Sequence, residues 1–123
     1  MCLFCQKYLE TDQILYENDS VYVIYDSFPV NEGHVLIITK RHIESYFQTT
    51  SKETQDIDQA LKHMKNVLDE HFHPDGYNIG INCEAAAGQT IMHLHVHLIP
   101  RYQFDTINPK GGVRGVIPKK QNY

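Results

Sequence analysis

The feature that most constrains this chain is an alternation of histidines with apolar residues in its second half. His93, His95 and His97 are separated by single residues, and the residues between and beside them are apolar. Successive side chains of a strand point to opposite faces, so the histidines are predicted to share one face and the apolar residues the other. A strand of this kind must bury its apolar face beneath a second layer. The chain is therefore expected to contain a sheet covered by another element.

Other segments carry the signals of further strands. The ranges 14–16 and 21–25 are rich in β-branched and aromatic residues and are separated by turn formers, which predicts a hairpin. Residues 34–39 form a short run that is typical of a buried central strand. A strand over 77–82 and a longer one over 91–100 complete the sheet.

The clearest helix is expected to begin after Thr49 or Thr50, because residues 50–53 have the form of a capping box. Apolar residues then recur at intervals of three and four as far as Leu68. A shorter helical turn is expected over 43–47. These elements predict an α+β fold, with an antiparallel sheet of about five strands, one long helix and one short helix.

Length and composition limit the possible functions. The 123 residues suffice for one core, so we expect a single domain over 1–123 with an extended tail that begins near residue 102. The formal net charge of -4 argues against binding of duplex nucleic acid, which requires a large basic surface. No segment approaches the roughly 20 apolar residues that span a bilayer. We therefore expect a soluble, cytoplasmic protein with no membrane partner and with reduced cysteines.

The histidine row admits three interpretations. In the first, the three rings are unrelated and half-exposed, which the strict alternation disfavours. In the second, alternate histidines bind one cation, since neutral imidazole is a good zinc ligand. In the third, which we favour, the middle histidine attacks phosphorus through one ring nitrogen while a neighbour orients the other nitrogen. The flanking donors then bind phosphate oxygens.

The segment from Gly88 to Arg101 closely resembles the signature of the histidine-triad nucleotide hydrolases and transferases. Pro29, the run 33–35, Lys40 and the run 70–72 are most similar to the fragile-histidine-triad branch, whose members cleave dinucleoside polyphosphates. The resemblance implies a homodimeric hydrolase that cleaves the α-phosphate linkage of dinucleoside polyphosphates or related nucleotide derivatives, phosphoramidates included, through a nucleotidyl-histidine intermediate. The alternative is a module that binds nucleotides without turnover, or a zinc-dependent sensor.

The same resemblance implies roles for individual residues. His95 matches the histidine that takes the nucleotidyl group, and His97 and His34 match residues that contact the α-phosphate and assist it. Gln89 matches a side chain that reaches the bridging or leaving-group oxygen. Three further positions match residues that contact substrate: Asp26 at the ribose, Asn82, and Thr90 beside the phosphate.

Cys2 and Cys5 have the spacing of a zinc half-site, and a tetrahedral structural site needs two more ligands. His42 and His93 are the candidates, because prokaryotic-type relatives of the family resemble this pattern. We expect such a zinc ion to be structural and not to activate the hydrolytic water. The competing interpretations are that the two cysteines are ordinary small residues, or that they form a redox pair.

Overall fold

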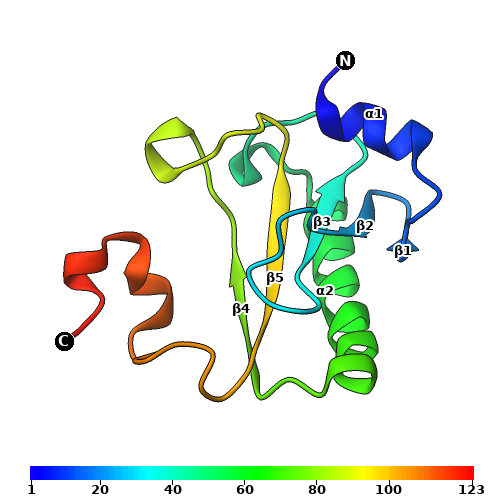
Figure 1. Cartoon of the computed structure of the whole chain (residues 1–123). Coiled ribbons are helices and arrows are strands. Elements are labelled where there is room, and N and C mark those ends of the chain that lie inside the picture. Colours follow the sequence, from blue (N-terminus) through cyan, green and yellow to red (C-terminus); the bar gives the residue numbers. More distant parts are fainter.

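The structure, a computed structural model, describes all 123 residues. Five strands form one antiparallel sheet in the order β1-β2-β3-β5-β4, and two α-helices lie against it (Figure 1). The strands are β1 (Tyr16–Glu17), β2 (Val21–Tyr25), β3 (Val35–Thr39), β4 (Gly76–Gly80) and β5 (His95–Arg101). The helices are α1 (Leu3–Glu10) and α2 (Ser51–Phe72). The expected α+β fold with a five-stranded antiparallel sheet is confirmed.

The two faces of the sheet bury different sets of side chains. One face packs against α2, and its core includes Leu94, Val96 and Leu98. The other face packs against α1 at one end of the sheet. Its smaller core comprises Phe4, Tyr22, Ile24, Leu36 and Ile38. Because side chains alternate along β5, His95 and His97 lie on the α1 side of the sheet, opposite the main core.

His93 does not belong to the strand row. β5 begins at His95, and residues 91–93 form bends. The N–H of Leu94 donates to the carbonyl of Ile43 at 2.7 Å, so the chain leaves the ladder with β3 before it reaches His93. The prediction that all three histidines share one strand face is therefore wrong for His93. Alternation predicted the faces within the strand, but it carried no information on where pairing starts.

Helix α2 begins and ends where its sequence signals predict. Thr50 accepts from the N–H of Glu53 through its hydroxyl, and the Glu53 carboxylate accepts from the N–H of Thr50. The helix ends before His73, which adopts a left-handed φ of 51° and caps it. The apolar side chains buried against the sheet are Ile57, Ala60, Met64 and Leu68.

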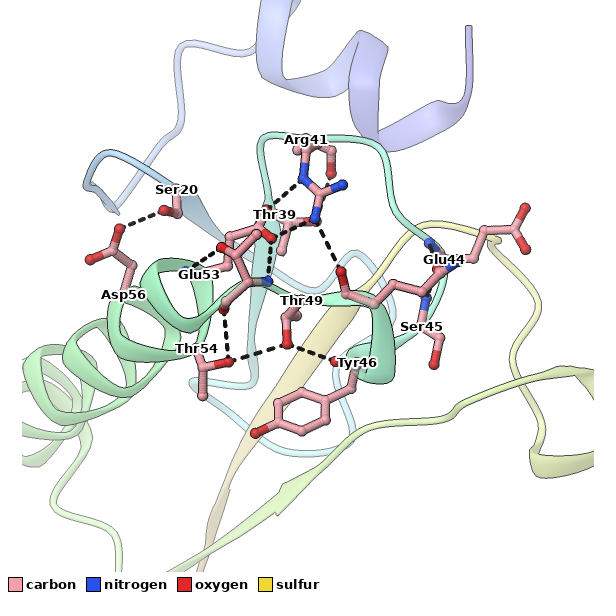
Figure 2. Close-up of polar contacts among 12 residues, drawn as sticks. Ser20, Thr39, Arg41, Glu44, Ser45, Tyr46, Thr49, Glu53, Thr54 and Asp56 are labelled. Carbon is pink, nitrogen blue, oxygen red and sulfur yellow. Dashed lines mark hydrogen bonds and ion pairs between the residues drawn. The ribbon is translucent and has the colours of Figure 1, made fainter.

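Figure 2 shows the polar contacts that join the loop after β3 to the first turns of α2. Arg41 donates to both carboxylate oxygens of Glu53, at 2.7 and 3.1 Å, and Ser20 donates to Asp56 at 2.5 Å. Both acidic side chains are buried, and a buried charge is costly unless it is paired. The Arg41–Glu53 pair holds the loop that carries His42 against the helix, and the Ser20–Asp56 pair holds the turn before β2.

The sequence-based prediction missed helix α1. The helix begins after Cys2, whose sulfur accepts from the N–H of Cys5 at 3.4 Å. Phe4 is buried beneath it, and the carbonyl of Phe4 accepts from the hydroxyl of Tyr22. An isolated helix of eight residues is only marginally stable in water, so its stability comes from packing on the sheet rather than from a local signal.

The remaining segments are short. Residues 43–47, expected to form a helical turn, contain the start of a 3-10 helix at Tyr46–Gln48. The tail after residue 101 has two further 3-10 helices, Gly112–Val116 and Pro118–Lys120. No helix has both the length and the apolar content required to cross a membrane.

Candidate active site and metal centre

Two cavities meet at His97 on the α1 side of the sheet. The first, of about 470 Å³, is lined by α1, by the end of β2, by the loop before β5 and by His95 and His97. The second, of about 730 Å³, lies between β4, β5 and the tail helix Gly112–Val116. Four residues line both cavities: Asp26, Phe28, Asn82 and His97. The shared wall can therefore contact the middle of a ligand whose two ends occupy different cavities.

The ring of His95 is held in one tautomer. Its Nδ1 lies 2.7 Å from the carbonyl oxygen of His93, so Nδ1 carries the hydrogen and donates it. The other ring nitrogen, Nε2, has no hydrogen-bond partner in the protein, and the ring lines the first cavity. The edge of the Phe4 ring packs against His95, with ring centroids 5.0 Å apart. In the neutral ring this tautomer leaves a lone pair on the nitrogen that faces the cavity, which nucleophilic attack requires.

His34 and His97 form a hydrogen-bonded pair, in which the tautomer of His34 determines the tautomer of His97. The N–H of Val30 donates to Nδ1 of His34 at 3.0 Å, so the hydrogen of neutral His34 is on Nε2. This Nε2 donates to Nδ1 of His97 at 2.9 Å, which places the hydrogen of His97 on its own Nε2. His97 can therefore donate from Nε2 to an oxygen in the cavity. The carboxylate of Asp26 lies 3.4 Å from Nε2 of His34 and supports the pair.

Both imidazoles of this pair are kept neutral. Burial lowers the pKa of His34, although the charge of Asp26 opposes the shift. Burial, followed by the neighbouring His95 and His34 rings, lowers the pKa of His97 to about 4. Near neutral pH the pair is therefore a chain of neutral donors and acceptors and not a positive centre.

Asp26, His34 and His97 also lie close enough together to suggest a metal site. A metal on Nε2 of His34 would displace the hydrogen from that nitrogen, and a neutral ring would then carry it on Nδ1. Nδ1 already accepts from the N–H of Val30 at 3.0 Å, so the hydrogen has no place there. The hydrogen-bond pattern favours a proton-bearing pair over a metal site.

Cys2, Cys5, His42 and His93 form the second cluster, as the sequence predicted. The thiol sulfurs lie 3.2 to 3.6 Å from Nδ1 of the two histidines. Tetrahedral zinc with ordinary bond lengths requires about 3.5 Å between sulfur and nitrogen ligands. Nε2 of His93 donates to the carbonyl of Thr39 at 2.7 Å, which leaves Nδ1 free to bind a cation. The four side chains fit a zinc ion in both distance and chemistry.

The two clusters are connected through His93 and Phe4. His93 contributes Nδ1 to the thiol cluster, and its backbone oxygen holds Nδ1 of His95. Phe4 lies between the two cysteines in sequence, contacts the rings of His93 and His95, and lines the first cavity. A metal ion in the cluster would therefore also fix one wall of the active-site cavity.

The remaining predicted residues divide into two groups. Asn82 and Thr90 line the first cavity together with Asp26, as a substrate-contacting role requires. Gln89 does not line it and is only 5% exposed. Its amide accepts from the N–H of Glu84 and donates to the carbonyls of Glu44 and Ile91, at 2.8 to 3.1 Å. These bonds direct the amide of Gln89 to backbone groups of the loop before β5 and of the loop after β3.

Sequence reasoning did not identify the part of the cavity that comes from α1. Leu3, Phe4 and Lys7 line the first cavity, and Phe28 lines both. The available signal was that Leu3 and Phe4 lie between two candidate zinc ligands. A helix anchored by those residues must pass close to His93, and therefore close to His95.

Comparison with known proteins gives consistent matches. Residues 9–104 match the HIT domain family. A bis(5'-adenosyl)-triphosphatase of Dictyostelium discoideum is 32% identical over 100 residues, which cover 81% of this chain and 67% of that protein. An uncharacterised HIT-like protein of Mycoplasma pneumoniae is 34% identical over 71% of this chain, and the match spans 60% of that relative's length. A Zn-bound histidine triad family protein from Mycobacterium smegmatis has a crystal structure with a TM-score of 0.77 and 30% identity, covering 87% of this chain and 79% of that one.

Proposed function

Because this chain belongs to the HIT domain family, we propose that it is a nucleotide hydrolase that cleaves the α-phosphate linkage of dinucleoside polyphosphates or related nucleotide derivatives. The observation that carries the proposal is the fixed tautomer of His95, whose Nδ1 hydrogen is bound by the His93 carbonyl while Nε2 is free in the cavity. Two cavities that share the His97 wall also suit a substrate with two bulky ends.

In the first proposed step, Nε2 of His95 forms a bond to the α-phosphorus. The bond between phosphorus and the leaving-group oxygen breaks, and its electron pair departs with that oxygen. His97, whose Nε2 carries the hydrogen, donates a hydrogen bond to a phosphate oxygen as charge builds up there. A leaving phosphate of low basicity needs no added proton, so a neutral His97 is sufficient.

In the second step, a water molecule attacks the same phosphorus and the phosphorus–nitrogen bond breaks. Nε2 of His95 recovers its lone pair, and the proton lost by water passes to solvent. Splitting one displacement into two in this way avoids direct attack of water on the intact substrate. Asp26, Asn82 and Thr90 are proposed to hold the ribose and phosphate during both steps, and His34 is proposed to keep His97 oriented.

The decisive experiment compares His95→Asn with the wild-type protein in hydrolysis of diadenosine triphosphate. We expect the variant to lose all measurable turnover, because an amide cannot form the covalent intermediate. His71→Asn is the matched control, since His71 is exposed at the end of α2 and should retain full activity. Mass spectrometry after an alkaline quench should find the nucleotidyl adduct on wild-type His95. Turnover in His95→Asn would exclude His95 as nucleophile, and tight nucleotide binding without wild-type turnover would favour the binding-module alternative.

We further propose that Cys2, Cys5, His42 and His93 hold a structural zinc ion. The fit of the sulfur–nitrogen distances to tetrahedral geometry supports this, as does the His93–Thr39 hydrogen bond. When bound, zinc would supply a cross-link between the start of α1 and the segment before β5. The hydrolytic chemistry above requires nothing from it.

Edge strand β4 supports the proposal of a homodimer. One side of β4 pairs with β5, and its other side has no partner strand. Tyr77 and Ile81 pack on the core beside α2, whereas Ile79 between them is 52% exposed. We expect Ile79→Lys to halve the mass measured by sedimentation, because a charge would be buried in the dimer contact. Ile107→Lys, in the exposed tail, should leave the mass unchanged. A wild-type monomer would contradict the dimer.

A further inference from the structure

We propose that Lys7 is a specificity-determining residue that reads the edge of the nucleobase and makes the site prefer 6-oxopurine nucleotides, those of guanine and hypoxanthine, over adenine nucleotides. The proposal rests on the proposed function only in taking a nucleotide as the ligand of the first cavity. It concerns the apolar lining of that cavity, to which no role has been assigned above.

The first cavity has both polar and apolar lining. His95, His97 and Asp26 supply the polar lining. The apolar lining is supplied by Leu3, Phe4, Ile24, Leu36 and Ile91. A nucleotide whose phosphorus is at His95 and whose ribose is near Asp26 would place its base against this apolar lining, because a base buries its flat faces more readily than a phosphate does.

Helix α1 carries Lys7 away from His95. The ring of Phe4 contacts His95 on β5, whereas the ring of Tyr8, one turn later, contacts Tyr22 on β2 at a centroid distance of 5.0 Å. The helix therefore runs across the sheet from the nucleophile toward the β1 and β2 side (Figure 1). Lys7 is three residues beyond Phe4, or about 4.5 Å farther along the axis. This direction leads away from the phosphate position.

Lys7 is a cation without a partner. It is partly buried, and its ammonium makes no ion pair and no hydrogen bond. Asp26, the only carboxylate that lines the cavity, interacts instead with His34 and with the N–H of Phe28. The lysines that do form ion pairs are Lys40, Lys52, Lys62 and Lys65. An unpaired ammonium on a cavity wall is free to bind an acceptor that a ligand brings.

The chemistry of the bases decides which ligand satisfies this ammonium. Guanine and hypoxanthine present two neighbouring acceptors, O6 and N7, and a lysine ammonium is a common partner for that pair. Adenine presents N7 beside an amino group, whose hydrogens face the ammonium unfavourably. The apolar walls accept any purine, so Lys7 is the group in this cavity that distinguishes them.

The test measures binding of GMP, IMP and AMP to the full-length protein by calorimetry. We expect GMP and IMP to bind about tenfold more tightly than AMP, the difference that one such contact supplies. Lys7→Met should remove the preference by weakening GMP and IMP alone, and Lys7→Arg should keep it. Lys119→Met is the matched control, because Lys119 is exposed in the tail and its loss changes the net charge equally.

Two results would overturn the proposal. Equal binding of GMP and AMP to the wild type would show that Lys7 does not read the base. Equal weakening of both nucleotides in Lys7→Met would show that Lys7 contacts the phosphate or ribose that they share. Turnover assays separate this inference from the proposed hydrolase activity. A guanine preference in a protein that hydrolyses no nucleotide would support base recognition by Lys7 and reject the hydrolase activity. Failure of every nucleotide to bind would reject both.

Discussion

Two pairs of histidines in this molecule use the same side chain for different purposes. His34 and His97 are linked ring to ring at 2.9 Å, and a backbone N–H occupies the outer nitrogen of the pair. His42 and His93 instead direct Nδ1 toward two thiols, and a backbone carbonyl occupies Nε2 of His93. A backbone N–H that donates to one ring nitrogen leaves the ring hydrogen on the other nitrogen, as in His34. A backbone carbonyl that accepts the ring hydrogen leaves a lone pair on the other nitrogen, as in His93. The polarity of the backbone contact thus decides whether a histidine passes on a hydrogen bond or offers a lone pair to a metal.

The largest expected effect comes from breaking each pair separately. His34→Asn should lower kcat for diadenosine triphosphate roughly 100-fold or more, because His97 loses the partner that fixes its tautomer. It should leave one zinc per chain, measured by elemental analysis. His42→Asn should do the reverse at the metal: zinc content should fall well below one per chain, while the reduction in kcat should be smaller.

Cys83→Ser is the matched control for the metal measurement, because Cys83 lies outside the thiol cluster. Loss of zinc in His34→Asn, or full zinc content in His42→Asn, would contradict the division of the histidines into two separate pairs.

The neutral pair predicts a specific loss of stability in acid. The pKa of His97 is about 4 in the folded protein, below its ordinary value of 6.5, so the unfolded chain binds the proton more readily. The free energy of unfolding should therefore fall as the pH drops from about 6.5 toward 4, by about 2 kcal/mol at pH 4.5 from this group. Urea denaturation at pH 7 and pH 4.5, in the presence of a chelator, measures the loss. His97→Asn should show a loss smaller by that amount, and an equal loss in both proteins would reject the low pKa of His97.

The smallest expected effect concerns Gln89. Gln89 bonds to backbone groups of the loop after His42 and of the segment before His93. Gln89→Ala should lower the free energy of unfolding by about 2 kcal/mol, because buried backbone groups lose their partners. Since its amide does not line the cavity, kcat should change far less than in His34→Asn. A fall in kcat at unchanged stability would instead support the leaving-group role that the family resemblance implies for Gln89.

Much of the fold could be predicted from local patterns. The capping box at Thr50, the apolar stripe of α2 and the strands over 21–25 and 34–39 all appear within one residue of their expected limits. These signals depend on side chains a few positions apart, so the sequence displays them directly. Helix α1 lacked such a signal because its stability depends on a sheet that is formed by distant residues.

The candidate site was predicted in its residue types more fully than in its arrangement. The two cysteines and two histidines predicted as zinc ligands converge in one cluster, and His34 and His97 are hydrogen-bonded near His95. The apolar lining from α1 could not be predicted, because it depends on the direction in which that helix crosses the sheet. The hydrogen-bond partners of Gln89 could not be predicted either, because one of them, the carbonyl of Glu44, is 45 residues away in sequence.

By itself, the amino-acid sequence determined which residues alternate, where the long helix starts, and which side chains can bind a metal or attack phosphorus. Only the tertiary structure decided that His93 leaves the strand, and that its carbonyl fixes the hydrogen of His95. The physical reason is that side-chain type sets what a ring nitrogen is able to do. The backbone groups that surround the ring after folding determine which nitrogen does it.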